Sequence, residues 1–226
     1  MGCDIHIWAE VKKDGKWQKV GKVFKNTYYE PGKPNRVYED EDGYESNPEM
    51  TDEPYQGRSY STFSILANVR NGYGFAGCDT GNGFLPIAFP RGIPSDVSAE
   101  ARACLESYDV DGHSHSYLTL AEIKAYNWQQ YTVKRGWVDA DGFKEFVADG
   151  KPSSYSGGVS GGKVSHVSNE TMKSAVAAGE TTNLYTQVEW RETYAESAHS
   201  FLVETVSELE KLGSPDEVRI VFFFDN

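Results

Sequence analysis

Two short stretches of this chain gather the residue types that transfer protons or bind metals. The first is Cys3-Asp4-Ile5-His6, and the second runs from Asp109 to Ser116 and contains His113 and His115. Together they hold three of the five histidines. An ordinary surface does not need imidazoles grouped with carboxylates, whereas catalytic and metal sites do. The sequence therefore predicts that the chemistry lies where these two stretches meet.

The spacing within each stretch indicates how the side chains could cooperate. In an extended segment, residues two apart point the same way, so Asp4 and His6 would share a face, and so would His113 and His115. One interpretation is a metal-free acid–base pair, with His6 opposite His113 or His115. A second is a divalent metal (zinc, manganese or magnesium) bound by Asp4, His6, Asp111, His113 and His115. The structural alternative is a half-buried strand histidine and two loop histidines.

Basic and aromatic residues supply candidates for substrate binding. Arg70 lies at the end of a predicted helix, and Arg91 lies in Pro90-Arg91-Gly92, so either could meet a phosphate. Tyr73 is one of many loop tyrosines, which suit stacking on a nucleotide base. The alternative for each of them is plain surface charge or loop packing.

The histidine-rich stretch is predicted to lie next to the start of a helix. Thr119 and Glu122 have the spacing of a capping box, so the helix should begin at Leu120. The free amides and the dipole at such a helix start attract anions.

The remaining patterns predict an α+β fold in one domain, residues 1–226, with a mixed, mainly antiparallel sheet covered by helices. An acidic, tyrosine-rich loop is expected at 26–58, and a mobile Ser/Gly-rich loop at 152–168. Other expected strands are 4–12, a second after the turn at Asp14-Gly15, 128–138, and a buried central one at 218–224. Expected helices are 61–70, 98–107, 141–148, 169–178 and 190–212.

Composition limits the classes of partner. The net charge is −12, which argues against binding duplex nucleic acid. Eight acidic residues and no basic one lie between Glu39 and Glu53, a pattern typical of a solvated loop and, more weakly, of a nucleic-acid mimic. The longest apolar run, 220–224, is too short to cross a bilayer, and no secretory signal is visible. Three cysteines without paired spacing indicate reduced thiols in a cytosol.

Several segments resemble a family of small tailed-phage proteins. The similarity is carried by Met1-Gly2-Cys3-Asp4-Ile5-His6, by Pro90-Arg91-Gly92-Ile93-Pro94 and by the segments 64–71, 113–122 and 224–226. The resemblance carries no catalytic assignment. It implies a viral protein acting in the cytoplasm of a bacterial host, and it raises anti-defence proteins that cleave or sequester nucleotide signals.

Three functions are therefore considered. The first is phosphodiesterase-type hydrolysis of a small nucleotide, with His6, His113 and His115 as catalytic residues. The second is a non-catalytic protein that sequesters such a nucleotide. The third is an acidic inhibitor of a basic host protein. The expected partner is a small nucleotide rather than duplex nucleic acid or a membrane, and homo-oligomerisation stays open.

Overall fold

Strand β9 (Val218–Asp225) lies at the centre of a four-stranded antiparallel sheet. The computed structural model describes residues 2–21, 23–25, 49–51, 54–55, 57–106 and 110–226. The strand order is β2-β1-β9-β5, with β1 (Asp4–Lys13), β2 (Lys16–Val20) and β5 (His113–Thr119). Every residue of β9 from Val218 to Phe224 is buried, because both faces of the sheet are covered. The prediction of a buried central strand is confirmed.

The alternating side chains of β9 pack into two separate hydrophobic cores, one on each face of the sheet. Ile220, Phe222 and Phe224 pack beneath α1 (Tyr60–Ala67), α3 (Leu120–Ala125) and a π-helical segment, η2 (Phe201–Val206). Val221 and Phe223 face the other side, where α2 (Ala99–Leu105) covers them. The sheet thus separates the α1 side from the α2 side.

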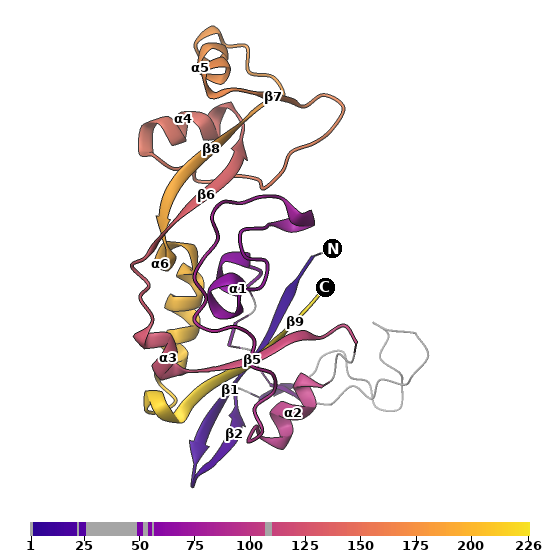
Figure 1. Cartoon of the computed structure of the whole chain (residues 1–226), viewed down its shortest axis with the longest axis vertical. Helices are drawn as coiled ribbons and strands as arrows, with labels where there is room; N and C mark the ends of the chain where they lie inside the picture. The colour runs from indigo at the N-terminus through magenta and orange to yellow at the C-terminus, as the bar shows by residue number, and fades with distance from the viewer. Residues whose placement is uncertain (1, 22, 26–48, 52–53, 56, 107–109) are drawn as a thin grey trace.

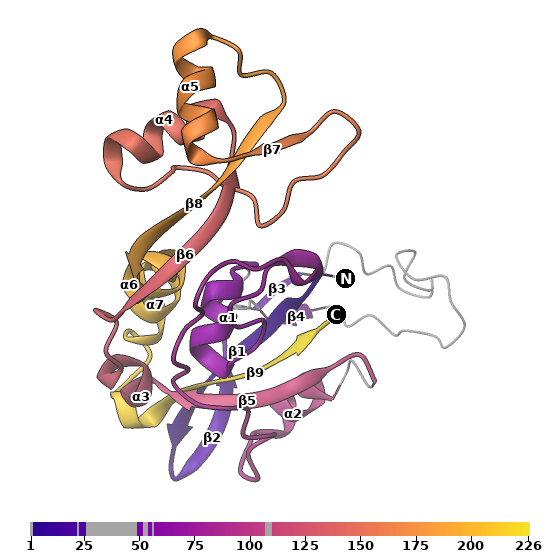
Figure 2. The ribbon, with the colours of Figure 1, turned by 45° about the horizontal axis from the view of Figure 1, so that its top comes forward.

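A second sheet lies at the opposite end of the molecule (Figures 1 and 2). Its order is β6-β8-β7, with β6 (Tyr131–Val138) antiparallel to β8 (Leu184–Thr193), and β7 (Ser165–Val167) parallel to it. Helices α4 (Ala140–Asp149) and α5 (Asn169–Ala178) pack against this sheet around Met172 and Trp190. In both views α1 lies between the two sheets. The α+β class is confirmed, but the strands form separate sheets rather than one.

The long helix predicted over residues 190–212 is wrong at its start. Residues up to Thr193 continue strand β8, and helix α6 (Tyr194–Ser197) begins only there. Thr193 and Glu196 form a capping box, which fixes this switch from strand to helix. After η2 the segment ends as α7 (Ser207–Leu209).

Most other predicted elements are present with shifted ends. The Asp14-Gly15 turn joins β1 to β2, and Thr119 and Glu122 form the expected capping box before α3. Helix α1 ends earlier than predicted, at a left-handed Asn68, so Arg70 lies in the following loop. The short remaining elements are β3 (Val23–Lys25), β4 (Glu49–Thr51), η1 (Phe75–Gly77) and η3 (Pro215–Glu217).

Two expected loops have different outcomes. Most of the acidic 26–58 segment lies outside the described residues. The 152–168 segment is described, and it contains strand β7 at its end. Within the part of the chain that the structure describes, no helix combines the length and apolar character needed to span a bilayer.

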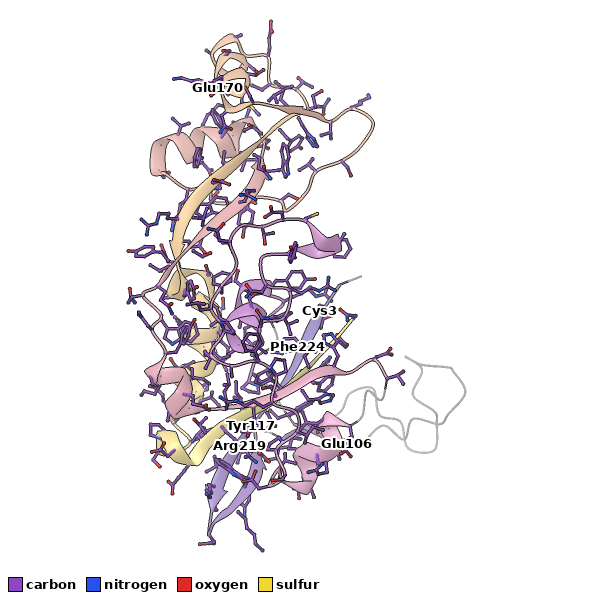
Figure 3. The ribbon with its side chains drawn as sticks, in the orientation of Figure 1. Cys3, Glu106, Tyr117, Glu170, Arg219 and Phe224 are labelled. Carbon is purple, nitrogen blue, oxygen red and sulfur yellow. The ribbon has the colours of Figure 1, made fainter. Side chains whose placement is uncertain are left out.

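A buried ion pair locks β1 to β9 on the α2 side. Arg219 Nε donates to Glu10 Oε2 at 2.7 Å, and both side chains are almost fully buried. A second nitrogen of Arg219 reaches Asp96 at 2.8 Å. The guanidinium also lies over the rings of Trp17 and Tyr117, the latter next to it in Figure 3. Removing one partner would leave a charge buried without its counterion.

We therefore predict that Glu10→Gln lowers the free energy of unfolding by about 3 kcal/mol, because Arg219 loses its buried counterion. Chemical denaturation at neutral pH measures this. The control is Glu208→Gln, which removes an exposed ion pair with Lys211 and should cost under about 0.5 kcal/mol. Equal effects of the two changes would contradict a structural role for the Glu10–Arg219 pair.

Candidate functional site

A β-bulge separates two of the three candidate histidines. The pairing of β5 with β9 shifts between His113 and Ser116, and Ser114 has a left-handed φ of 54°. The ring of His113 stacks on Phe224, whereas that of His115 stacks on Phe223. Successive residues of a strand face opposite sides of its sheet. The expectation that His113 and His115 share a face is therefore wrong, because the extra residue of the bulge reverses it.

His6 and His115 share the α2 side but do not form a pair. Each ring stacks on Phe223, with centroids 4.9 Å and 5.1 Å from the phenyl ring, and they come from strands on either side of β9. The phenyl ring therefore lies between the two imidazoles. His6 instead pairs with Asp225, whose Oδ2 is 3.2 Å from His6 Nε2. The three histidines do not form the single acid–base pocket that we expected.

The five residues proposed as metal ligands are dispersed in the same way. Asp111 is exposed and precedes the first residue of β5. Asp4 forms a bidentate ion pair with Arg58, whose hydrogen bond lowers the pKa of that carboxyl. Within the described ranges, no three His, Cys, Asp or Glu side chains are placed to hold one metal ion. The single metal site is therefore not formed.

The structure instead shows a basic and aromatic pocket between α1 and β6. Its volume is about 380 Å³. Three cationic residues line it, Arg58, Arg70 and Lys134, although the chain as a whole carries a net charge of −12. The other lining residues are uncharged and include four aromatic rings: Ser59, Tyr60, Ser61, Ser64, Gly72, Tyr73, Gly74, Thr80, Phe84 and Tyr155. Such a lining favours an anion that carries a planar ring.

The first residues of the chain position one wall of this pocket. The Cys3 amide donates to the Tyr60 hydroxyl at 3.2 Å, and the Tyr60 ring lies under the Arg70 guanidinium. Arg70 in turn donates to the Gly2 carbonyl at 3.2 Å and to Asn226 Oδ1 at 2.8 Å. Burial raises the pKa of the Cys3 thiol, which argues against a thiolate nucleophile there. The Gly2-Cys3-Asp4 opening thus serves to hold the pocket's cations and Tyr60.

Lys134 forms the opposite wall from strand β6. Its residue is only 7% exposed, and its Nζ donates to Ser61 Oγ at 2.7 Å. The rings of Phe84 and Tyr155 lie 5.5 Å and 5.8 Å from the same nitrogen. Among the described residues, no carboxylate forms an ion pair with Lys134. An ammonium has three donors, so two remain for a ligand.

Residues 71–84, which follow α1, connect the two walls of the pocket. The Asn71 side chain accepts from the Phe84 amide and donates to its carbonyl, both at 2.7 Å. Gly81 then passes so close to β6 that a Cβ would lie 2.0 Å from the Val133 oxygen, at a φ of +120°. Only glycine fits this position. The segment 71–84, which lines the pocket with Gly72, Thr80 and Phe84, is therefore held in place against β6.

The predicted substrate-binding residues are partly brought together. Arg70 and Tyr73 line the pocket, and Tyr73 is 56% exposed at its rim. Arg91 does not line it; its guanidinium is bound to Glu122 at 2.7 Å and to the Tyr117 carbonyl. The sequence reasoning missed Lys134. The residue types gave no signal for it, because β6 buries the face with Thr132, Lys134 and Val138 rather than the face with Trp137.

Comparison with family models, with curated proteins and with solved structures found no match to this chain.

His113 should contribute to acid sensitivity. Burial, followed by the nearby Arg70 charge, lowers the pKa of His113 below its ordinary value of about 6.5. The unfolded chain therefore binds a proton more readily, so stability is full above about pH 6.5 and falls as the pH decreases below it. We predict that His113→Gln reduces the loss of unfolding free energy between about pH 7.5 and about pH 5. Denaturation at both pH values measures this, with exposed His199→Gln as control; identical pH dependence in all three proteins would contradict it.

Lys134 should behave as a functional rather than a stabilising residue. Replacing a buried charge by an apolar side chain of similar length removes a desolvation penalty. We predict that Lys134→Met leaves the free energy of unfolding unchanged or raises it by up to about 1 kcal/mol. A loss of more than about 2 kcal/mol in chemical denaturation would show that the ammonium holds the fold together and would contradict this role.

Proposed function

We propose that this protein binds a small nucleotide in the pocket between α1 and β6 and holds it without hydrolysing it. The observation that carries the proposal is the buried ammonium of Lys134, which has no carboxylate partner among the described residues. A phosphate group would neutralise it and accept its remaining hydrogen bonds. Arg58 and Arg70 line the same pocket and add positive charge around the phosphate.

Aromatic side chains favour a nucleotide over a simple inorganic anion. Tyr73 and Tyr155 are 56% and 40% exposed, so their ring faces are accessible for stacking. Stacking of a base on an aromatic ring contributes about 1–3 kcal/mol and tolerates any base. The volume of about 380 Å³ is within the range of small-ligand pockets.

The described lining lacks imidazole, carboxylate and thiol groups, which favours binding over cleavage. None of the described residues that line the pocket is a His, Asp, Glu or Cys. A hydrolase needs a positioned group to activate water and to protonate the leaving group. In the phage setting that the sequence resemblance implies, such a protein would sequester a nucleotide signal in the host cytoplasm.

Phosphodiesterase-type hydrolysis is the second candidate, and one contact favours it. His6 and Asp225 form a half-buried pair at 3.2 Å, in which the carboxylate would orient the imidazole as a base. The pair lies on the α2 side of the sheet and not in the lining of the pocket. The third candidate, an acidic inhibitor, depends on the 39–53 segment, most of which lies outside the described residues.

We predict that the purified protein binds nucleotides from a panel of adenine and guanine compounds, and that Lys134→Met weakens binding at least tenfold. The reason is the loss of the buried phosphate donor. Isothermal titration calorimetry measures the affinity. Lys144→Met is the matched control, because Lys144 is an exposed lysine on α4 that pairs with Asp141.

Chromatography of the same mixtures separates the candidates. Nucleotide recovered intact after heat denaturation of the protein agrees with sequestration. Product formation that His6→Gln abolishes would favour hydrolysis instead. If no nucleotide binds, the proposal is wrong, and capture of a basic host protein would then favour the inhibitor.

A further inference from the structure

We infer that the pocket selects a phosphodiester, whose singly charged phosphate binds Lys134 Nζ and Ser61 Oγ. This inference rests on the proposed function and specifies its ligand class. It follows from the protein contacts of the three cations that line the pocket and from how deeply each cation is buried.

Two of the three cations have protein partners. Arg58 is held by both oxygens of Asp4, so its charge is already opposed. Arg70 donates to two uncharged acceptors, the Gly2 carbonyl and Asn226 Oδ1, which fix its guanidinium at the half-buried wall without neutralising it. These contacts shape the wall, and neither arginine is as deeply buried as Lys134.

Lys134 therefore supplies one positive charge in the buried part of the pocket. It is bordered by the rings of Phe84 and Tyr155 and bonded to Ser61 Oγ. Ser61 lies in the first turn of α1, where the amides of Tyr60 and Ser61 have no acceptor within the helix. The Ser59 hydroxyl caps the next amide, that of Thr62. A phosphate bound to Lys134 and Ser61 would thus also meet helix amides, which favour anions.

The number of charges decides which phosphate fits best. A phosphodiester carries one negative charge and balances the ammonium of Lys134. A phosphomonoester carries about 1.5 to 2 negative charges at neutral pH, and a triphosphate carries more. Burying charge beyond what the site neutralises is unfavourable. We therefore expect diesters to bind more tightly than monoesters or triphosphates with the same base.

The test compares ligands that differ mainly in phosphate charge. Calorimetry with the whole chain measures binding of 3′,5′-cyclic AMP, the linear diester adenylyl-(3′→5′)-adenosine, AMP, ATP and adenosine, together with cyclic GMP and GMP. The expected result is that a diester binds at least tenfold more tightly than AMP, GMP and ATP. Adenosine, which lacks phosphate, should bind more weakly than the diesters.

Variants test whether the preference for diesters comes from Lys134 and Ser61. In Lys134→Met the diesters should lose their advantage over adenosine, and Ser61→Ala, which keeps the charge, should weaken them several-fold. Lys144→Met should change nothing, and thermal unfolding verifies that each variant is folded. ATP or AMP binding as tightly as the diesters, or a diester preference that survives in Lys134→Met, would overturn the inference while leaving nucleotide binding intact. Failure of every nucleotide to bind the unmodified chain would overturn the proposed function itself.

Discussion

A single ammonium group, that of Lys134, gives the junction between the two sheets its chemical character. Lys134 lies on β6 and donates to the Ser61 hydroxyl on α1, so this hydrogen bond connects the β6 sheet to α1. The surrounding residues offer rings and a hydroxyl but, in the described part of the chain, no carboxylate. The contrast with Arg219 is instructive, because that equally buried cation is matched by Glu10. The Arg219 charge holds strands together, whereas we propose that the Lys134 charge is matched by a ligand.

The sheet around β9 explains why the pocket keeps its shape. Its core rings, including Phe224 at the end of the strand, fix β1 beside β9. This pairing places Gly2 and Asn226 next to each other, where both accept hydrogen bonds from Arg70 (Figure 3 shows Cys3 and Phe224 at this end). The opening residues, the segment 64–71 and the last residues 224–226 thus contribute directly to one wall of the pocket.

Several elements could be predicted from the sequence because their signals are local. The apolar run of β9, the Asp14-Gly15 turn and the capping box at Thr119 each depend on residues a few positions apart. Arg70 and Tyr73 were found from local features too, Arg70 as a basic residue at the end of a predicted helix and Tyr73 as one of the loop tyrosines. The boundary at Thr193 was missed because the apolar residues before it fit a helix and a strand equally well. Pairing with β6, a tertiary contact, decides for the strand.

The predicted histidine site is wrong for a different reason. The rule that residues two apart share a face assumes a regular strand, and the bulge at Ser114 breaks that rule by one residue. No sequence pattern marks this bulge, since Ser114 is not a glycine. Lys134 was missed because the large apolar residues Val133 and Trp137 lie on the other face of its strand. A buried lysine runs against the usual preference of that side chain for solvent.

A crystal structure of the protein with a bound nucleotide tests the central claim most directly. We expect a phosphate oxygen within about 3 Å of Lys134 Nζ and of Ser61 Oγ, with the base against Tyr73 or Tyr155. A nucleotide seated beside His6 and Asp225 instead, or a Lys134 ammonium found paired with a carboxylate of the protein, would contradict the account.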